Sequence, residues 1–401
     1  MTRPQPRSFV VGGGVALVAV ALASVNLRPA ASSVGPVLEE IRTGLGMGGG
    51  LAGLLTGLPG LSFALAGALA VGFARKVGLT AGIALGLVAA TAGLLLRATT
   101  GSAWVFLLLS AVALAGMAVG NVLVPAWIKR YGGRRQVTLA TVYGTGLILG
   151  GSLGSLLTAP LSSALEGWVR GLGAWGLMIL LALPAWTWLA LRERRNPADH
   201  QVVGVAPTGR MASSPTAVAM TALFGVQSMH AYIQFGWLPQ IYRDGGLSAS
   251  QAGLMQALVS GVGILGGLAM PTLIARARSL SPYVVGFGVL LASGYLGLLL
   301  LPATLPWLWA LMLGVAGFAF PLVIAMLPAR TRHPQVTAQL SGFVQPVGYL
   351  AAAAGPVIVG VLHEVTGGWT LVLALLAATA VPFTWAGLRA SRPVYVDDEL
   401  A

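Results

Sequence analysis

The sequence predicts an all-α membrane protein with twelve transmembrane helices in two pseudo-symmetric six-helix halves. Composition is the first indication: 56% of the 401 residues are hydrophobic, 8% are charged and the mean hydropathy is +0.85. A soluble domain carries about 25% charged residues, so a soluble enzyme or binding module is excluded. The other two indications are a series of membrane-length apolar runs and a repeat at half the chain length.

Twelve apolar runs approach the roughly 20 residues that a transmembrane helix needs. A charged residue or a proline marks the break after each of the first eleven, in chain order Arg42, Lys76, Arg97, Arg130, Glu166, Arg194, Asp244, Arg276, Pro302, Arg330 and Glu364. The predicted spans are 9–36, 47–73, 78–96, 102–127, 137–160, 168–191, 214–241, 249–274, 281–301, 305–328, 337–362 and 367–388.

The basic residues predict the orientation. Eighteen of the 23 Lys and Arg residues lie in one set of alternate loops and the termini, and four lie in the other set: Arg42, Arg97, Arg170 and Arg243. Cytoplasmic loops are enriched in Lys and Arg, so both termini are expected on the cytoplasmic side of the cell membrane. Topology thereby accounts for the net charge of +13, and no nucleic-acid partner is expected. We expect the first run to be retained rather than cleaved as a signal peptide, because its loss would break the alternation.

An internal repeat divides the chain. Residues 25–55 align with residues 226–255, so that Asn26 faces Gln227, Pro36 faces Pro239 and Arg42 faces Arg243. The offset is about half the chain length, which is typical of transporters whose two parallel repeats enclose a substrate site near the midplane. We expect an N-terminal half at 1–191, a cytoplasmic linker at 192–213 and a C-terminal half at 214–401.

The sequence contains no complete motif of a known catalytic site. The chain has no cysteine and no GxxxxGK[ST] sequence, which excludes a thiol nucleophile and a P-loop. The GxSxG match at residues 150–154 lies within a span, where Gly146, Gly150 and Gly154 predict close helix packing instead of a nucleophile elbow. His363 and Glu364 begin a zinc-protease motif, but Gly367 replaces its second histidine. We therefore expect no enzyme, no catalytic residue, no cofactor and no metal.

Arg28 is the only formal charge in the interior of a predicted span, away from its ends. An arginine at the centre of a membrane helix costs about 2.5–3.5 kcal/mol on insertion scales, so it is expected to face a cavity and to serve function. No carboxylate within a span is available to neutralise it, which favours an anionic or strongly dipolar ligand. The planar guanidinium suits carboxylate-like or linear polyatomic anions.

Polar residues recur at helical spacing along single faces of two spans. Ser24, Arg28 and Ser32 share one face of span one, and Gln227, His230 and Gln234 share one face of span seven. Each neutral residue could instead make only an interhelical hydrogen bond, worth about 0.6 kcal/mol. The candidate solute-binding residues are Arg28, Asn26, Ser24, Ser32, Asn121, Tyr143, Gln227, His230, Gln234, Trp237, Gln345 and Tyr349.

Several short motifs resemble one family. Span one carries Asn26-Leu-Arg-Pro29 and Ser33-Val-Gly-Pro36, and span four carries residues 120–125 (GNVLVP) followed by IKR at 128–130. Further matches are Gln227-Ser228, Trp237-Leu-Pro239 and Thr366-Gly-Gly-Trp369. The chain resembles the cyanate permease and 2-nitroimidazole transporter branch of the major facilitator superfamily. This resemblance implies the twelve-helix, two-half fold and transport of small solutes such as anions or nitro-heterocycles.

We therefore expect a secondary active or facilitative transporter that moves a cyanate-like anion, a small carboxylate or a nitro-heterocycle by alternating access. Import is favoured over export. The alternatives are a multidrug or metabolite exporter of the same fold and a non-transporting membrane sensor. The expected partners are the solute and the lipid bilayer, and a monomer is expected. The sequence leaves open whether transport is coupled to protons. His230 is the candidate proton carrier, but repulsion from a nearby arginine would oppose its protonation, which favours a facilitator.

Overall fold

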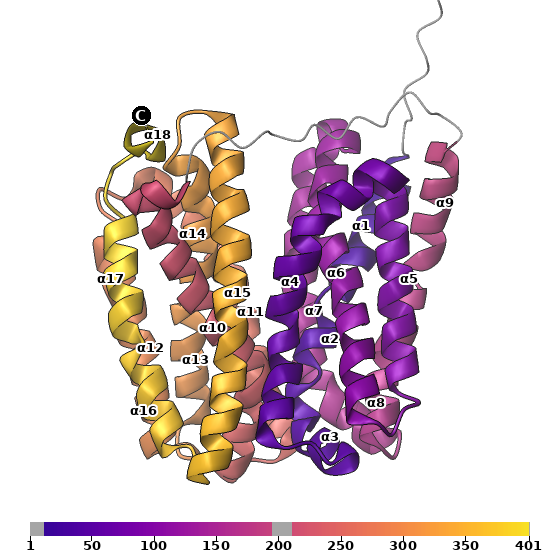
Figure 1. Cartoon of the computed structure of the whole chain (residues 1–401), viewed down its shortest axis with the longest axis vertical. Coiled ribbons are helices and arrows are strands. Elements are labelled where there is room, and N and C mark those ends of the chain that lie inside the picture. The colour runs from indigo at the N-terminus through magenta and orange to yellow at the C-terminus, as the bar shows by residue number, and fades with distance from the viewer. Residues whose placement is uncertain (1–11, 195–210, 401) are drawn as a thin grey trace, which may run out of the picture.

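The protein is all-helical over residues 12–194 and 211–400, the ranges that this computed structural model describes. The first half contains α1 (Gly13–Asn26), α2 (Pro29–Ser32), η1 (Gly35–Val37), α3 (Leu38–Leu45), α4 (Gly49–Val77), α5 (Leu79–Arg97), α6 (Ala103–Tyr131), η2 (Gly133–Arg135), α7 (Gln136–Ala164), α8 (Trp168–Leu180) and α9 (Leu183–Arg194). These helices form one of the two bundles that Figure 1 shows side by side.

The second bundle follows after residues 195–210, so most of the expected linker 192–213 lies outside the described residues. It contains η4 (Met211–Ser213), α10 (Pro215–Asp244), α11 (Ala249–Arg276), α12 (Ser281–Leu300), α13 (Pro306–Ala316), α14 (Ala319–Ala329), α15 (Pro334–Thr366), α16 (Thr370–Ala378), α17 (Ala380–Ala390) and α18 (Val396–Glu399).

Eleven segments of the described chain are long and apolar enough to cross a membrane, and each coincides with one predicted span. The remaining prediction, 214–241, corresponds to α10, a continuous helix of 30 residues. Its polar side chains, among them Gln227, His230 and Gln234, make this helix less apolar than the others. The helix is present, but its polarity reflects a role in the interior of the protein.

Four of the predicted spans are interrupted, and a proline lies near the start of the second helix in each. Pro29 begins α2, and Pro184, Pro321 and Pro382 lie within the first three residues of α9, α14 and α17. Proline fits the first helical turn, where its missing N–H leaves no hydrogen bond unmade, but it breaks the interior of a helix. The proline therefore sets where each span divides.

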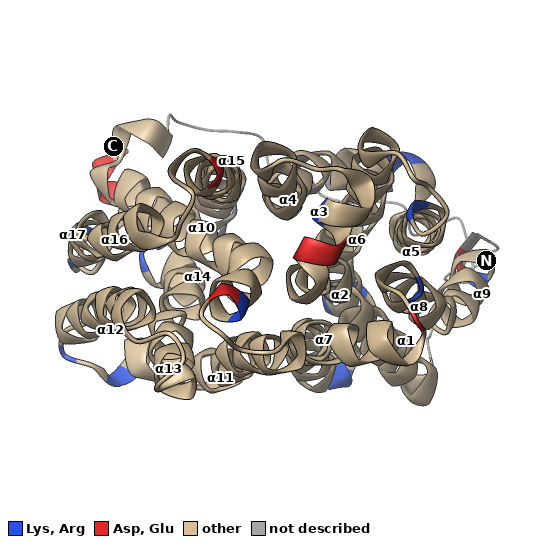
Figure 2. Cartoon of the chain, turned by 90° about the horizontal axis from the view of Figure 1, so that it is seen from below, with Lys and Arg blue, Asp and Glu red and all other residues tan. Residues whose placement is uncertain are grey.

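The most extensive contacts between the two halves are made by two helix pairs, α4 with α15 and α7 with α11, which Figure 2 shows on opposite edges of the interface. Glycines permit these close approaches. A Cβ added at Gly53 would lie 2.7 Å from the carbonyl oxygen of Pro356, and one at Gly57 would lie 2.7 Å from that of Ala353. A Cβ at Gly253 would lie 2.5 Å from the carbonyl oxygen of Ser155.

These contacts lie toward one end of the bundle, which we call the acidic face because Glu39, Glu40, Asp244 and Glu364 lie there. Three polar contacts join the halves at this face: Arg243 pairs with Glu40 at 2.8 Å and donates to the backbone oxygen of Pro36 at 3.5 Å, and Glu364 accepts from the backbone N–H of Gly50 at 3.2 Å. The acidic face is therefore closed in this structure.

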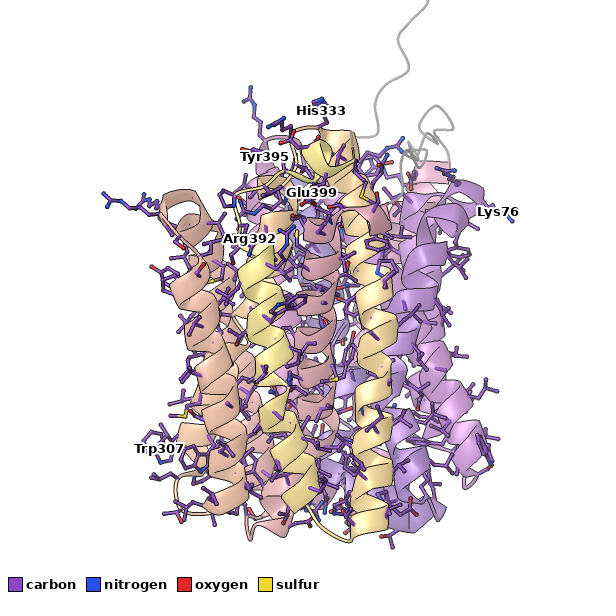
Figure 3. The ribbon with its side chains drawn as sticks, turned by 60° about the vertical axis from the view of Figure 1, so that its left-hand side comes forward. Lys76, Trp307, His333, Arg392, Tyr395 and Glu399 are labelled. Atoms are coloured by element: carbon purple, nitrogen blue, oxygen red, sulfur yellow. The ribbon has the colours of Figure 1, made fainter. Side chains whose placement is uncertain are left out.

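The opposite end carries most of the described Lys and Arg residues and is called the basic face. Figure 3 shows Lys76, His333, Arg392, Tyr395 and Glu399 toward this end and Trp307 toward the other. Here the facing helices have separated: a Cβ at Gly144 of α7, or at Gly263 or Gly267 of α11, would meet nothing within 4 Å. The interface opens toward the basic face.

Candidate solute-binding site

A cavity of about 340 Å³ lies between the two halves. Arg28 and the α7 residues Gly144, Ile148 and Gly151 line it from the first half. The second half supplies residues of α10, α11, α13 and α14, including the break between α13 and α14 at Gly317. A second hollow shares Gly144, Ile148 and Gly267 with it and extends to Gln136 at the start of α7, toward the basic face. The cavity thus lies at the centre of the molecule and is accessible from the basic face.

Arg28 lies at the break between α1 and α2, where Pro29 begins the second helix. Its guanidinium carbon is 5.5 Å from the ring centroid of Phe63 on α4, a cation–π contact. Among the described residues, no carboxylate pairs with it and no side chain hydrogen-bonds to it. Arg28 is half-buried and lines the cavity, so its five N–H donors are available to a ligand.

The other candidates on span one pack against α7 rather than line the cavity. Ser24 lies against Gly146 and Ser32 against Gly154, and each hydroxyl donates to a carbonyl of its own helix segment. The predicted packing role of the α7 glycines is confirmed here. Asn26 is also buried: its Nδ2 donates to Leu22 O at 2.8 Å, and its Oδ1 has no hydrogen-bond partner among the described residues.

Asn121 on α6 and Tyr143 on α7 form a pair. The Tyr143 hydroxyl donates to Asn121, lying 2.8 Å from Oδ1 and 3.0 Å from the backbone oxygen. Tyr143 lies within electrostatic range of Arg28, as do Tyr232 and Tyr349. The pair therefore stands beside the cation without lining the cavity itself.

Of the four candidate residues on α10, some line the cavity and others are buried in the interior of the second half. Gln227 and Gln234 line the cavity. His230 is fully buried within the second half, and Trp237 donates its Nε1–H to Pro356 O at 3.0 Å toward the acidic face. Two of the four predicted residues on this helix thus reach the place where a solute would sit.

A directional chain of hydrogen bonds ties Gln234 to His230. The Thr379 hydroxyl donates to Leu376 O, so it can only accept from His230 Nε2–H, 2.8 Å away. His230 Nδ1 then accepts from the Tyr295 hydroxyl at 2.9 Å, and Tyr295 in turn accepts from Gln234 Nε2 at 3.2 Å. The neutral histidine is therefore fully hydrogen-bonded.

The two candidates on α15 differ in their surroundings. Gln345 Nε2 donates to Ser341 Oγ of the same helix at 2.7 Å. Tyr349 packs among aromatic rings, with centroids 5.8 Å from Phe63, 4.9 Å from Phe224 and 6.0 Å from Tyr232. Because Phe63 belongs to the first half, this aromatic group joins the two halves beside Arg28.

The sequence analysis missed four residues at or behind the cavity. Gln256 and Ser260 line it from α11, and their i, i+4 spacing places them on one helical face, as the i, i+3, i+7 spacing does for Gln227, His230 and Gln234. Phe63, beneath Arg28, and Tyr295, behind Gln234, carry no signal in the sequence, because an aromatic residue within a span is ordinarily packing.

Comparison with known proteins identifies the fold and its relatives. The family model described as Major Facilitator Superfamily matches residues 15–356. The chain is 32% identical to the uncharacterized transporter YycB of Bacillus subtilis, over 98% of this chain and 97% of that one. It is 30% identical to the 2-nitroimidazole transporter of Escherichia coli (94% and 95% of the chains) and 31% identical to that organism's cyanate transport protein CynX (88% and 91%). The crystal structure of the nucleoside transporter NupG superposes with a TM-score of 0.74 at 13% identity, over 95% and 100% of the chains, which shows the shared fold alone.

Proposed function

The chain belongs to the major facilitator superfamily and is a multi-pass membrane transporter of small solutes, and from this premise we propose that its solute is a small anion or polar molecule held at Arg28. The observation that carries the proposal is the unpaired guanidinium of Arg28 in the cavity between the halves. A cation in a low-dielectric site without a counter-ion attracts a negative or strongly dipolar ligand. The names of the two Escherichia coli relatives, which refer to cyanate and 2-nitroimidazole, are consistent with this solute class.

The proposed mechanism is alternating access. The halves, taken as residues 1–191 and 214–401, would rock about the cavity so that the acidic face opens as the basic face closes. The excess of Lys and Arg on the basic face supports placing it, and both termini, in the cytoplasm. The structure would then be the inward-facing state of a monomeric transporter, and the segment 192–213 would be the cytoplasmic linker.

We further propose facilitated transport without obligatory proton coupling. The ring nitrogens of His230 are both engaged when the histidine is neutral, and His230 lies behind Gln234 rather than in the cavity. Protonation would force Tyr295 to give up its donation to Nδ1. An inward proton gradient is therefore expected to leave uptake unchanged, both in the natural protein and in His230→Gln. Acceleration by the gradient that disappears in His230→Gln would instead establish His230 as the proton carrier.

Uptake into proteoliposomes tests the proposed function. Purified protein would be supplied with radiolabelled cyanate, acetate, benzoate or 2-nitroimidazole, with protein-free liposomes as the control. We expect saturable uptake of at least one compound and competition among those that bind. Efflux alone from preloaded vesicles would favour the exporter alternative. Binding of a panel member without movement in either direction would favour the sensor.

A further inference from the structure

We propose that the solute is a two-ended organic anion: its charged end binds Arg28 of the first half, and a hydrogen-bond donor at its other end binds glutamine oxygens of the second half. The inference rests on the proposed function and narrows its solute class. It comes from the direction in which each polar group of the cavity can hydrogen-bond.

The amide of Gln256 is held in one orientation by Ser260. The Ser260 hydroxyl donates to the backbone oxygen of Gln256 at 3.1 Å, so its proton is already used. Toward the side chain it can only accept, and Gln256 Nε2 is the group 3.4 Å away. Gln256 Oε1 is consequently the free atom of the amide. It is buried and has no donor among the described residues.

Two residues of α10 offer the same chemistry. Gln234 turns its Nε2 to Tyr295, whose own proton goes to His230, so the Oε1 of Gln234 is the free atom of that amide. Gln227, which is 4% exposed, lines the cavity and also has an unpartnered Oε1. Three glutamines that line the cavity therefore have free acceptors. A buried acceptor without a donor is unfavourable, and a ligand N–H or O–H would relieve this cost.

The first half has the opposite polarity. Arg28 carries donors only and a full positive charge, with Phe63 against its face. An anion can satisfy Arg28, but an anion without a proton to donate cannot satisfy the glutamines. A ligand that satisfies both sides of the cavity thus carries a negative group at one end and a donor at the other.

The space between these ends is apolar. Leu147, Phe235, Val259, Phe320 and Ile324 line it, and the volume of about 340 Å³ falls in the range of roughly 300–1,000 Å³ typical of drug-sized ligands. A three-atom anion at Arg28 would leave the glutamines without a partner. A ring or short carbon skeleton suits the lining better.

A ligand of this kind would join the halves. Its anionic end would be held by the first half and its donor by α10 and α11 of the second, so that both sets of contacts favour closure around the same molecule. A ligand with one end only would bind without drawing the halves together. Transport would then discriminate between solutes more strongly than binding does.

Matched benzoates test the inference on the purified full-length protein. Affinity would be measured by calorimetry for benzoate, for 3- and 4-hydroxybenzoate and for the corresponding methoxybenzoates, which keep the oxygen but lack the proton. We expect one hydroxybenzoate to bind at least about tenfold more tightly than its methoxy analogue, the equivalent of about 1.4 kcal/mol. This preference should be lost in Gln256→Met and retained in Gln345→Met, whose glutamine bonds within its own helix.

A second variant keeps Gln256 and releases only its orientation. Ser260→Ala frees the amide to rotate, so the preference for a hydroxyl over a methoxyl group should fall, as it should in Gln256→Met. Equal affinities for hydroxy and methoxy compounds, with binding still abolished by Arg28→Met, would overturn the two-ended ligand and leave the proposed anion site intact. If no benzoate bound but cyanate or 2-nitroimidazole still bound in an Arg28-dependent manner, the two-ended ligand alone would be overturned. If none of these compounds bound in an Arg28-dependent manner, the proposed function itself would be contradicted.

Discussion

Two arginines in apolar surroundings show how differently the same residue can be placed. The sequence analysis assigned Arg97 to a loop, but the structure buries it at the end of α5, 1% exposed, with Nη1 donating to Ser110 Oγ at 3.3 Å and the guanidinium carbon 5.4 Å from the centroid of Phe106. A cation in the last turn of a helix is stabilised by the helix dipole. Arg97 thus lies in a closed site with one side-chain hydrogen bond, and its Nε and Nη2 have no partner among the described residues. Arg28 instead faces the cavity, with Phe63 as its one described contact of this kind.

Replacing Arg28 is expected to abolish solute binding. Hydrogen bonds to a charged group contribute about 1.5–3 kcal/mol, so Arg28→Ala should weaken binding by at least tenfold. Arg28→Lys should do nearly the same, because an ammonium group cannot reproduce the planar fork. Calorimetry with the tightest-binding compound of the uptake panel measures both. Arg170→Ala, which removes an exposed arginine from the acidic face, is the control and should bind normally. Unchanged affinity in Arg28→Ala would refute the assignment.

At the scale of elements, the halves meet where glycines let helix backbones touch. Gly53 and Gly57 of α4 lie against α15 near the acidic face, where any side chain would displace the facing backbone. Glycines on the open side, such as Gly144 and Gly267, face empty space in this state. The glycine pattern therefore supports the closed acidic face, and the same pattern predicts how to open it.

Gly57→Leu should shift the protein toward the state in which the acidic face is open. The new side chain would overlap the backbone at Ala353, so the closed contact between α4 and α15 would be destabilised. The measurement is thiol labelling of Glu40→Cys in this cysteine-free chain, which should be faster in Gly57→Leu. Gly286→Leu on α12, where a Cβ meets nothing within 4 Å, is the control. Equal labelling in all three backgrounds would contradict the role of this contact.

Glu399 of the C-terminal helix α18 makes hydrogen bonds and an ion pair to helices α10 and α17 of the second half. Its carboxylate accepts from Ser214 and Thr216 at the start of α10 and pairs with Arg389 at 3.2 Å. Burial raises the pKa of Glu399, but these hydrogen bonds outweigh burial and hold the pKa below its usual value of 4.5. Because the pKa is lowered in the folded state, the stabilisation is present above pH 4.5 and is lost as pH falls through the folded pKa.

Acidification should therefore lower the melting temperature of the natural protein more than that of Glu399→Gln. The glutamine cannot ionise, so the variant should be less stable at pH 7 and should lose less on going from pH 7 to pH 4. Thermal unfolding in detergent at both pH values measures the difference. The same pH-dependent loss in both proteins would show that Glu399 does not stabilise α18.

The sequence predicted the overall plan well because periodic apolar runs and charge bias are local signals. It also indicated Arg28, Gln227 and Gln234, which line the cavity. It could not place His230 behind Gln234, since both lie on one helical face and their separation depends on where α12 and α16 pack. The burial of Arg97 could not be predicted for the same reason: neighbouring helices bury it, and the local sequence pattern does not show how those helices pack.

At the scale of the whole molecule, a central cavity lies between a face where the halves are in contact and a face where they are apart. This is the arrangement expected of one state in the proposed alternating-access mechanism. The repeat places Pro36 and Pro239 at equivalent positions, and the structure brings their segments together: a Cβ at Gly35 would lie 3.1 Å from Cγ of Pro239, and Arg243 Nη1 lies 3.5 Å from Pro36 O. These segments must separate if the acidic face is to open.

Cross-linking these segments tests the rocking of the halves most directly. Pro36→Cys with Pro239→Cys introduces the only two cysteines of the chain, and the pair would be oxidised in proteoliposomes and its cross-linking followed by mass spectrometry. The account predicts that complete cross-linking stops uptake and that reduction restores it, while each single variant transports normally under oxidant. Undiminished transport through a fully cross-linked protein would contradict alternating access.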